Sequence, residues 1–354
     1  MADREDGPTT RATEPREPAD SDPGSSSGGL ESRVLLARAR VRLLGRSPEP
    51  VHVGRYRILS RLGQGGMGVV YLAHDDELDR RVAIKILRHD LAPSSAGRSR
   101  LLREAQATAR LSHPNVVHVY EVGHEADQVY MAMEYIEGET LRRWCDGKPR
   151  SCAELVAIFS AAGEALAAAH EAGLVHRDFK PDNVLVGRDG RPRVVDFGLA
   201  RADEATTTMS GREPTAKHSP IDVTATATLA GTPAYMAPEQ HARQGADPRS
   251  DQFAFCVSLF EALYRKRPFG GETLTELAVQ VAEGAIATVD PVAAGVPMRV
   301  HAAVMRGLSR HARQRFATMR ELLAELREAA APRARRAWWP FAAIGAGALA
   351  VAAL

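Results

Sequence analysis

The sequence predicts an α+β protein of two lobes, a small β-rich lobe followed by a larger helical lobe. The chain of 354 residues is longer than one small domain needs. Strand-like runs are concentrated before residue 135, and helical periodicity dominates after about residue 140. Hydrophobic residues make up 44% and charged residues 25%, which is ordinary for a globular chain. This composition excludes a wholly disordered or fibrous protein.

The first lobe is expected to be built mainly from strands. Apolar and β-branched residues form short runs there, and a glycine-rich turn separates the first two runs. We expect strands at 56–59, 69–73, 81–87, 116–122 and 128–134, and a helix at about 97–111.

The second lobe is expected to be helical. Apolar residues recur at helical spacing in 153–172, 252–264 and 317–329. The last helix is preceded by Thr318 with Glu321 three residues on, the pattern of a capping box.

The two ends of the chain differ from the lobes in composition. Residues 1–54 are expected to be a disordered tail and linker, since the first 30 residues are rich in Pro, Gly, Ser and charge. They lack the apolar stretch of a signal peptide. Residues 31–46 alternate arginine with Val and Leu, which favours a solvated linker helix over a segment that docks on a membrane or on the folded domain. The lobes are then expected at 55–136 and 137–330.

The C-terminal segment 337–354 is a candidate transmembrane helix. It has no charged side chain and follows a basic segment, 331–336, that carries three arginines. Eighteen helical residues span roughly 27 Å, about the thickness of a bilayer core. The flanking arginines would keep the lobes on the cytoplasmic side of a cell membrane, as a single-pass protein. The alternative is an Ala-rich, weakly apolar tail, because Pro340, Gly345 and Gly347 lower helix propensity.

Charge, cysteine and lysine content narrow the function classes. A formal net charge of +2 gives no argument for a nucleic-acid partner. Three cysteines are too few and too dispersed for a disulfide framework or a zinc site. Only five of the 46 Lys and Arg residues are lysine, so a position that keeps lysine calls for a compact ammonium.

The glycine turn and the lysine after it carry the first functional signal. Gly-x-Gly-x-x-Gly at 63–68 alone is weak, and here it lies between two strands instead of before the helix of a dinucleotide site. A glycine hairpin lets the backbone approach a triphosphate closely. Lys85, inside the next strand at Val82-Ala83-Ile84-Lys85, makes a simple tight hairpin less plausible.

Three further motifs follow in order. They are His176-Arg177-Asp178-Phe179-Lys180-Pro181-Asp182-Asn183, Asp196-Phe197-Gly198 and Ala237-Pro238-Glu239. Together with the glycine turn, they resemble protein kinases of the Hanks type, and specifically bacterial eukaryotic-like serine/threonine kinases. The resemblance covers about residues 56–329 and implies the bilobal protein kinase fold, with an N-lobe and a C-lobe.

The resemblance assigns roles to individual residues. Asp178 would orient the substrate hydroxyl and accept its proton, Lys180 would steady the transferring phosphoryl group, and Lys85 would contact phosphates. Glu104 would hold Lys85. Asn183 and Asp196 would ligate Mg²⁺, with Mn²⁺ as an alternative ion. The residues around ATP would be Leu62, Gly63, Gln64, Gly65, Gly66, Met67, Gly68, Val70, Ala83, Lys85, Met133, Glu134, Ile136 and Leu185.

The segment 196–239 matches the activation loop of the family and is rich in threonine. Its positions most similar to bacterial autophosphorylation sites are Thr224 and Thr226, and Thr228 close by is a further candidate. The resemblance gives structural roles, among them reading a loop phosphate and bracing the catalytic loop, to His176, Arg177, Phe197, Thr232, Glu239, Asp251 and Arg315. His311-Ala312 stands where the family usually has Asp-Pro before the last of these.

The resemblance implies an ATP-dependent kinase that phosphorylates protein Ser/Thr hydroxyls and its own activation loop. The main alternative is a pseudokinase scaffold, which typically lacks one of the catalytic or metal residues. A small-molecule phosphotransferase is disfavoured by Ala237-Pro238-Glu239 and the threonine-rich loop. Small residues in 342–350 also allow a homodimer, although alanine is so common there that the pattern says little.

Overall fold

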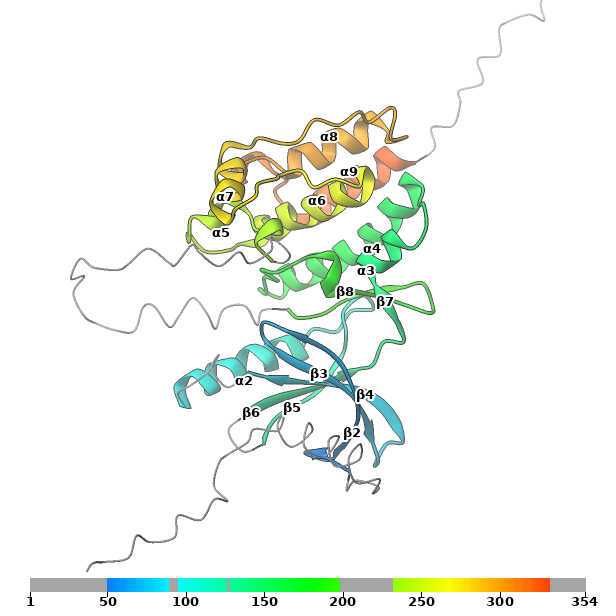
Figure 1. Cartoon of the computed structure of the whole chain (residues 1–354), viewed down its shortest axis with the longest axis vertical. Helices are drawn as coiled ribbons and strands as arrows, with labels where there is room; N and C mark the ends of the chain where they lie inside the picture. The colour runs from blue at the N-terminus through cyan, green and yellow to red at the C-terminus, as the bar shows by residue number, and fades with distance from the viewer. Residues whose placement is uncertain (1–49, 89–94, 126–127, 198–231, 332–354) are drawn as a thin grey trace, which may run out of the picture. The chain divides into compact units, whose positions relative to one another are not determined.

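A six-stranded antiparallel sheet forms the first lobe (Figure 1). The computed structural model describes residues 50–88, 95–125, 128–197 and 232–331. The strand order is β1-β2-β3-β4-β6-β5. The strands are β1 His52–Val53, β2 Tyr56–Gly65, β3 Gly68–Asp75, β4 Arg80–Leu87, β5 Val119–Glu125 and β6 Gln128–Glu134.

The middle of this sheet is apolar, since both faces of strand β4 are buried along most of its length. Strand β4 lies between β3 and β6, and all its residues from Val82 to Leu87 are buried. Helix α2, Ser95–Ala109, contacts β5 and β6. Lys85 is the one charged residue in the buried run of β4, and only 3% of its surface is exposed.

Helices form most of the second lobe. They are α3 Leu141–Asp146, α4 Cys152–Glu171, α5 Pro238–His241, α6 Pro248–Tyr264, α7 Leu274–Glu283, α8 Met298–Gly307 and α9 Met319–Ala330. A small sheet of order β7-β8-β9 faces the first lobe, with strands Gly138–Thr140, Val184–Gly187 and Pro192–Val194. The 3-10 turns are η2 Pro181–Asn183, η5 Thr232–Tyr235 and η6 Ala312–Gln314.

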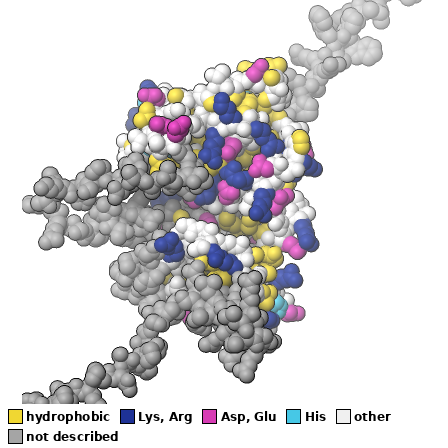
Figure 2. All heavy atoms as spheres, in the orientation of Figure 1, with side chains coloured by type: hydrophobic (Ala, Val, Ile, Leu, Met, Phe, Trp, Pro, Cys, Tyr) yellow, Lys and Arg dark blue, Asp and Glu magenta, His cyan; other side chains and the backbone are white. Residues whose placement is uncertain are grey.

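The core of the second lobe is packed around α4 and α6. Phe159 of α4 meets Phe255 of α6 edge to face, with ring centroids 5.8 Å apart. Gly163 lets α9 pack closely on α4, since a Cβ there would lie 2.5 Å from Leu323. Acidic and basic side chains are interspersed over the face drawn in Figure 2.

Ordered structure begins earlier than the boundary expected at residue 54. Residues His52–Val53 pair with β2, and Val53 has no exposed surface. The Gly54 N–H donates to Glu125 Oε2 at 2.7 Å, which ties this turn to the far edge strand. The first lobe therefore includes three residues that the sequence placed in the tail, His52, Val53 and Gly54.

The cap of α9 also differs from the expected capping box. Thr318 Oγ1 accepts from the Glu321 N–H at 3.2 Å, as predicted. The Glu321 carboxylate, however, accepts from the Ala317 N–H at 3.1 Å instead of from the cap residue itself. The reciprocal bond thus forms one residue earlier than a capping box requires.

Within the described ranges, α4 is the one helix long and apolar enough to cross a membrane. However, 61% of its apolar window is buried inside the lobe, which identifies it as a core helix. The expected transmembrane segment 337–354 and the basic segment before it lie outside the described residues, apart from Ala331.

Candidate active site

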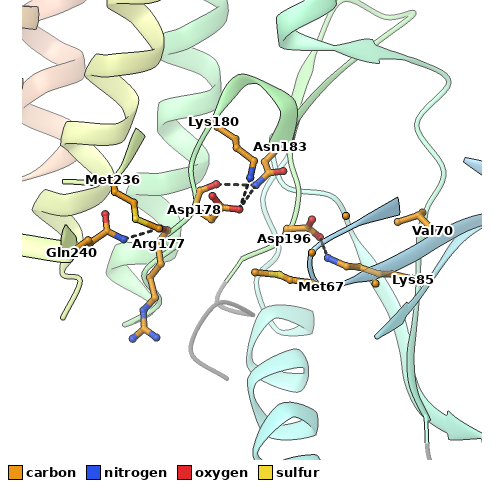
Figure 3. Close-up of a pocket in the computed structure, with 13 residues that line it drawn as sticks. Met67, Val70, Lys85, Arg177, Asp178, Lys180, Asn183, Asp196, Met236 and Gln240 are labelled. Atoms are coloured by element: carbon orange, nitrogen blue, oxygen red, sulfur yellow. Dashed lines mark hydrogen bonds and ion pairs between the residues drawn. The ribbon is translucent and has the colours of Figure 1, made fainter. Parts of the chain in front are cut away.

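A cavity of about 460 Å³ lies between the glycine turn of the first lobe and a loop of the second (Figure 3). Most of its polar lining comes from the motifs that the sequence singled out. The lining residues are Gly65, Gly66, Met67, Gly68, Val70, Lys85, Arg177, Asp178, Lys180, Asn183, Asp196, Met236 and Gln240.

The glycines of the β2–β3 turn meet different constraints. Gly68 has a φ of 156°, and a Cβ there would lie 2.0 Å from the Ile86 carbonyl oxygen of β4, so close strand packing requires glycine. At Gly63, Gly65 and Gly66 a Cβ would meet no atom within 4 Å. Packing within the described residues therefore does not require these three glycines. Without a Cβ, their backbone can approach phosphates closely.

Lys85 and Asp196 form an ion pair between the two lobes. Lys85 Nζ donates to Asp196 Oδ1 at 2.7 Å (Figure 3). Burial raises the pKa of Asp196, but the charge and hydrogen bond of Lys85, together with the charges of His176 and Lys180, lower it more, so the pKa lies below its ordinary value. Asp196 has a φ of 66°, and such left-handed geometry at a non-glycine residue is typical of functional sites.

Glu104 lies half-buried on α2, the helix next to the sheet. One turn later, Thr108 Oγ1 donates to the Phe197 carbonyl at 3.2 Å, which connects α2 to the residue after Asp196. The pairing of Glu104 with Lys85 stays a prediction.

Asp178, Lys180 and Asn183 are brought together by the loop that ends in η2. Lys180 Nζ donates to Asp178 Oδ2 at 2.8 Å. Asn183 Nδ2 donates to the Asp178 carbonyl at 2.8 Å and to Oδ2 at 3.1 Å. Asp178 lines the cavity, and its Oδ1 is buried and has no hydrogen-bond partner among the described residues.

Asp251, in the first turn of α6, binds the backbone of this loop through its carboxylate. Its Oδ2 accepts from the His176 N–H and its Oδ1 from the Arg177 N–H, both at 2.8 Å. The side chain is 1% exposed and also contacts His170 Nε2 at 2.8 Å. Because both carboxylate oxygens take backbone donors, the position of the loop 176–183 is fixed by a helix of the core.

His176 and Phe197 pack against each other behind the cavity. Their ring centroids are 4.7 Å apart, and His176 Nε2 lies 2.9 Å from the Val195 carbonyl. Both residues are buried. These contacts join the loop 176–183 to the segment that follows β9 and leads to Asp196.

Arg177 is turned away from Asp178 in Figure 3. Its φ is 70°, and its carbonyl accepts from Gln240 Nε2 at 2.9 Å. Two of its guanidinium nitrogens, Nε and Nη1, are buried and lack a hydrogen-bond partner among the described residues.

Glu239 and Arg315 form a bidentate pair although His311-Ala312 replaces the family's usual residues. Arg315 Nη1 and Nη2 donate to the two carboxylate oxygens at 2.7 and 2.9 Å. Ser250 Oγ donates to the same carboxylate at 2.6 Å. Arg315 is 2% exposed, so this ion pair is part of the core.

The residues expected around adenine are only partly brought to the cavity. Gly65, Gly66, Met67, Gly68, Val70 and Lys85 line it. Ala83 and Met133 are cross-strand neighbours in the buried N-lobe core, and Leu62 is 47% exposed. The expected residues outside the cavity lining are Leu62, Gly63, Gln64, Ala83, Met133, Glu134, Ile136 and Leu185.

Two lining residues were not expected from the sequence. Met236 and Gln240 flank Ala237-Pro238-Glu239 in the sequence. Their position next to that motif is the one sequence feature that could have indicated them as site residues. Thr232 opens η5, while Thr224, Thr226 and Thr228 lie outside the described residues.

Comparison with known proteins agrees with this geometry. Residues 56–326 match the family described as protein kinase domain. Serine/threonine-protein kinase PrkC of Bacillus subtilis (strain 168) is 37% identical over 278 residues, covering 78% of this chain and 40% of that protein. Serine/threonine-protein kinase PknL of Mycobacterium tuberculosis (strain ATCC 25618 / H37Rv) is 35% identical over 264 residues, covering 74% and 62%.

A similar fold is found among solved structures. The crystal structure of the Mycobacterium tuberculosis PknI kinase domain matches with a TM-score of 0.57 and 26% identity, covering 79% of this chain and 98% of that one. The chain spans about two fifths of the length of curated relatives such as PrkC. Because the family match covers well over half of the chain, this protein belongs to the protein kinase family.

Proposed function

We propose that this chain is an active serine/threonine protein kinase that transfers the γ-phosphate of Mg-ATP to protein hydroxyls. The observation that carries the proposal is the convergence of Lys85, Asp178, Lys180, Asn183 and Asp196 on one cavity. Phosphoryl transfer is mainly positioning and charge neutralisation, and these residues supply both.

The cavity fits a magnesium-bound triphosphate. The described residues contain no cluster of three His, Cys, Asp or Glu side chains that could enclose a metal by themselves. Mg²⁺ usually keeps water and takes phosphate oxygens in addition to one or two protein ligands. Asn183 and Asp196 would hold the ion, which would neutralise charge on the phosphates, and the bare backbone at Gly65 and Gly66 leaves room for them.

The remaining polar groups can act on the acceptor hydroxyl and the phosphates. The unpartnered Oδ1 of Asp178 would orient the hydroxyl and take its proton. Lys180, already 2.8 Å from the same carboxylate, would stabilise the negative charge that develops during transfer. Lys85 would bind the nonreacting phosphates.

The choice of serine and threonine as acceptors is supported by the names of relatives. It is also supported by Lys180, because a lysine two residues after Asp178 matches the serine/threonine branch of the family. PrkC and PknL are both serine/threonine-protein kinases by name. The pseudokinase alternative is disfavoured because no catalytic or metal residue of the motif set is missing.

Autophosphorylation of the segment after Asp196 is the proposed means of activation. The two unpartnered guanidinium nitrogens of Arg177 are suited to a phosphate, since arginine binds phosphate through parallel N–H donors. Thr224, Thr226 and Thr228 are the proposed acceptors. Phosphopeptide mapping after incubation of wild-type protein with Mg-ATP should find phosphothreonine at these positions, and the Lys85→Met variant should show none. Label confined to other segments would contradict these sites.

Anchoring by residues 337–354 is proposed as the localisation, with the kinase domain cytoplasmic. The support is compositional: 18 residues without charge after Arg333, Arg335 and Arg336. The full chain should sediment with membranes, and deletion of 337–354 should release it. Full-length protein that stays soluble without detergent would contradict the anchor. A homodimer through 342–350 stays a prediction.

A phosphotransfer assay tests the activity itself. Full-length wild-type protein with labelled ATP and Mg²⁺ should incorporate label as phosphoserine or phosphothreonine. Lys85→Met should lower the rate by about 10²-fold or more, as loss of a preorganised charge does elsewhere. Equal, low incorporation by both proteins would contradict the proposal.

A further inference from the structure

The link between the lobes, residues 134–138, lies against the hairpin formed by β8 and β9. Gly138 pairs with Gly187 in the small sheet, and the Arg188 N–H donates to the Glu137 carbonyl at 3.0 Å. On the other side of the hairpin, Arg193 Nε lies 3.4 Å from Glu134 Oε1. The hairpin thus contacts both ends of the link.

Arg193 is held in place by a second carboxylate. Its Nη1 and Nη2 donate to Asp189 Oδ1 and Oδ2 at 3.1 and 2.8 Å, and the side chain is only 13% exposed. The hydrogen bonds from Arg193 and from the Arg191 N–H lower the pKa of Asp189 to about 2, so it is ionised at neutral pH. A bidentate pair fixes the guanidinium plane, and Nε lies within ion-pair distance of Glu134.

Gly187 lies next to this ion pair and leaves room for it. A Cβ on Gly187 would lie 2.6 Å from Asp189 Oδ1 and 2.9 Å from Arg193 Nη1. Any larger residue at 187 would displace the pair. Glycine at 187 leaves the space that the Asp189–Arg193 pair occupies, and its backbone angle is not unusual.

The strand that carries Arg193 also leads to the phosphate end of the cavity. The next residue, Val194, donates its N–H to the Asn115 carbonyl at 2.8 Å, and the Val195 N–H donates to the Asn183 carbonyl at 3.0 Å. Asp196 follows directly. One hydrogen-bonded strand therefore connects Arg193 with both proposed magnesium ligands.

We propose that Arg193 is a positioning residue for the nucleotide. It acts through Glu134, setting the distance between the backbone of 134–136, which would bind adenine, and Asp196 at the phosphate end. Arg193 itself is not among the residues that line the cavity, so it is not a catalytic residue. The inference rests on the proposed kinase activity.

The test compares Arg193→Met with wild type in the full chain. The KM for ATP should rise by about fivefold, the scale of losing one well-held ion pair, while the KM for a peptide substrate stays within twofold. The ratio of kcat/KM for ATP to that for GTP should fall, because the adenine-binding backbone is displaced. Arg193→Lys should give an intermediate KM for ATP, since it keeps the charge but loses the bidentate fork.

A matched control comes from the same hairpin. Arg188 pairs with Glu137 at 3.2 Å but its side chain is 78% exposed, so Arg188→Met should leave the KM for ATP within twofold of wild type. In a Glu134→Gln background, Arg193→Met should add little, because the two changes remove the same contact.

Several outcomes would overturn the proposal. An unchanged KM for ATP in a well-folded Arg193→Met protein is one. An equal rise of both KM values together with a lowered melting temperature is another, since it indicates a merely structural role. If Arg193→Met does not fold, Arg193→Lys and Asp189→Asn are used in its place. An unchanged KM for ATP in both of these variants would then overturn the proposal. A wild-type protein that transfers no phosphate would instead contradict the proposed function.

Discussion

The two lysines at the cavity each face a carboxylate, Lys85 with Asp196 at 2.7 Å and Lys180 with Asp178 at 2.8 Å. They are two of only five lysines in the chain, which otherwise uses arginine for positive charge. A compact ammonium suits these places because a planar guanidinium has a different shape and donor geometry. The scarcity of lysine in the sequence was therefore informative about the site.

Lys85→Arg should consequently abolish most activity although the charge is kept. We expect the rate of phosphotransfer to fall by about 10²-fold or more, because the larger guanidinium does not fit the buried position. Lys148→Arg, at an exposed position, is the control and should retain the wild-type rate. Comparable rates for Lys85→Arg and wild type would show that charge alone suffices.

Arg315 gives a prediction about stability. It is 2% exposed and pairs with Glu239, so Arg315→Met leaves a carboxylate without its ionic partner in a largely buried site. The free energy of unfolding should fall by about 3–5 kcal/mol in urea titrations. Arg313→Met, at an exposed position nearby, should change it by about 0.5 kcal/mol or less.

The same pair predicts a pH dependence. Burial would raise the pKa of Glu239, but hydrogen bonds from Arg315 and Ser250 outweigh it, so the pKa lies below its ordinary value of 4.5. A lowered pKa in the folded state stabilises the fold above the unfolded-state value, and this contribution is lost as the pH falls through the folded-state pKa. The stability advantage of wild type over Glu239→Gln should therefore shrink below about pH 4.5. An advantage that stays constant from pH 7 to 3 would contradict the assignment.

At the scale of elements, strong periodic patterns were sufficient to predict β3, β4, β6 and the long helices. These elements bury continuous or regularly spaced apolar residues, which is visible in the sequence itself. The short strands β7, β8 and β9 were not expected. They are three or four residues long, which is too short for a recognisable alternation of apolar residues. Strand β7 also pairs with a strand more than forty residues away, so no local sequence pattern predicts the pairing.

The residues at and around the site also fall into a group that the sequence predicted and a group that it did not. Motif residues such as Asp178, Asn183 and Asp196 were predicted because their order along the chain is specific, and the fold does bring them together. The contacts of Arg193 with Glu134 and of Gln240 with Arg177 were not predicted, since the two residues of each pair lie on separate elements. Spatial contacts of this kind depend on tertiary packing and have no fixed spacing in sequence.

The β2–β3 turn gives a prediction that belongs to an element. Gly68→Ala would place a Cβ 2.0 Å from the Ile86 carbonyl, so the hairpin must separate from β4. We expect a loss of about 1–3 kcal/mol in the free energy of unfolding. Gly63→Ala, where the added Cβ meets nothing within 4 Å, is the matched control. Equal stabilities of the two variants would contradict the close packing of β3 on β4.

At the scale of the folded unit, the site exists only because both lobes contribute to it. The first lobe supplies the glycine turn and Lys85, and the second supplies Asp178, Asn183 and Asp196. Asp251 fixes the loop 176–183 to the helical core, and the Lys85–Asp196 pair joins the lobes directly. A lobe expressed alone would hold only part of this set.

The central claim is that this assembled cavity transfers phosphate. The most direct measurement is label transfer from [γ-³²P]ATP to a protein substrate by the full chain, with wild type and Asp178→Asn compared at equal, saturating Mg-ATP. Asp178→Asn keeps the size of the side chain but removes the acceptor for the hydroxyl proton. We predict robust transfer by wild type and a rate lower by about 10²-fold or more in the variant. Equal rates in the two proteins, or no transfer by either, would contradict the claim.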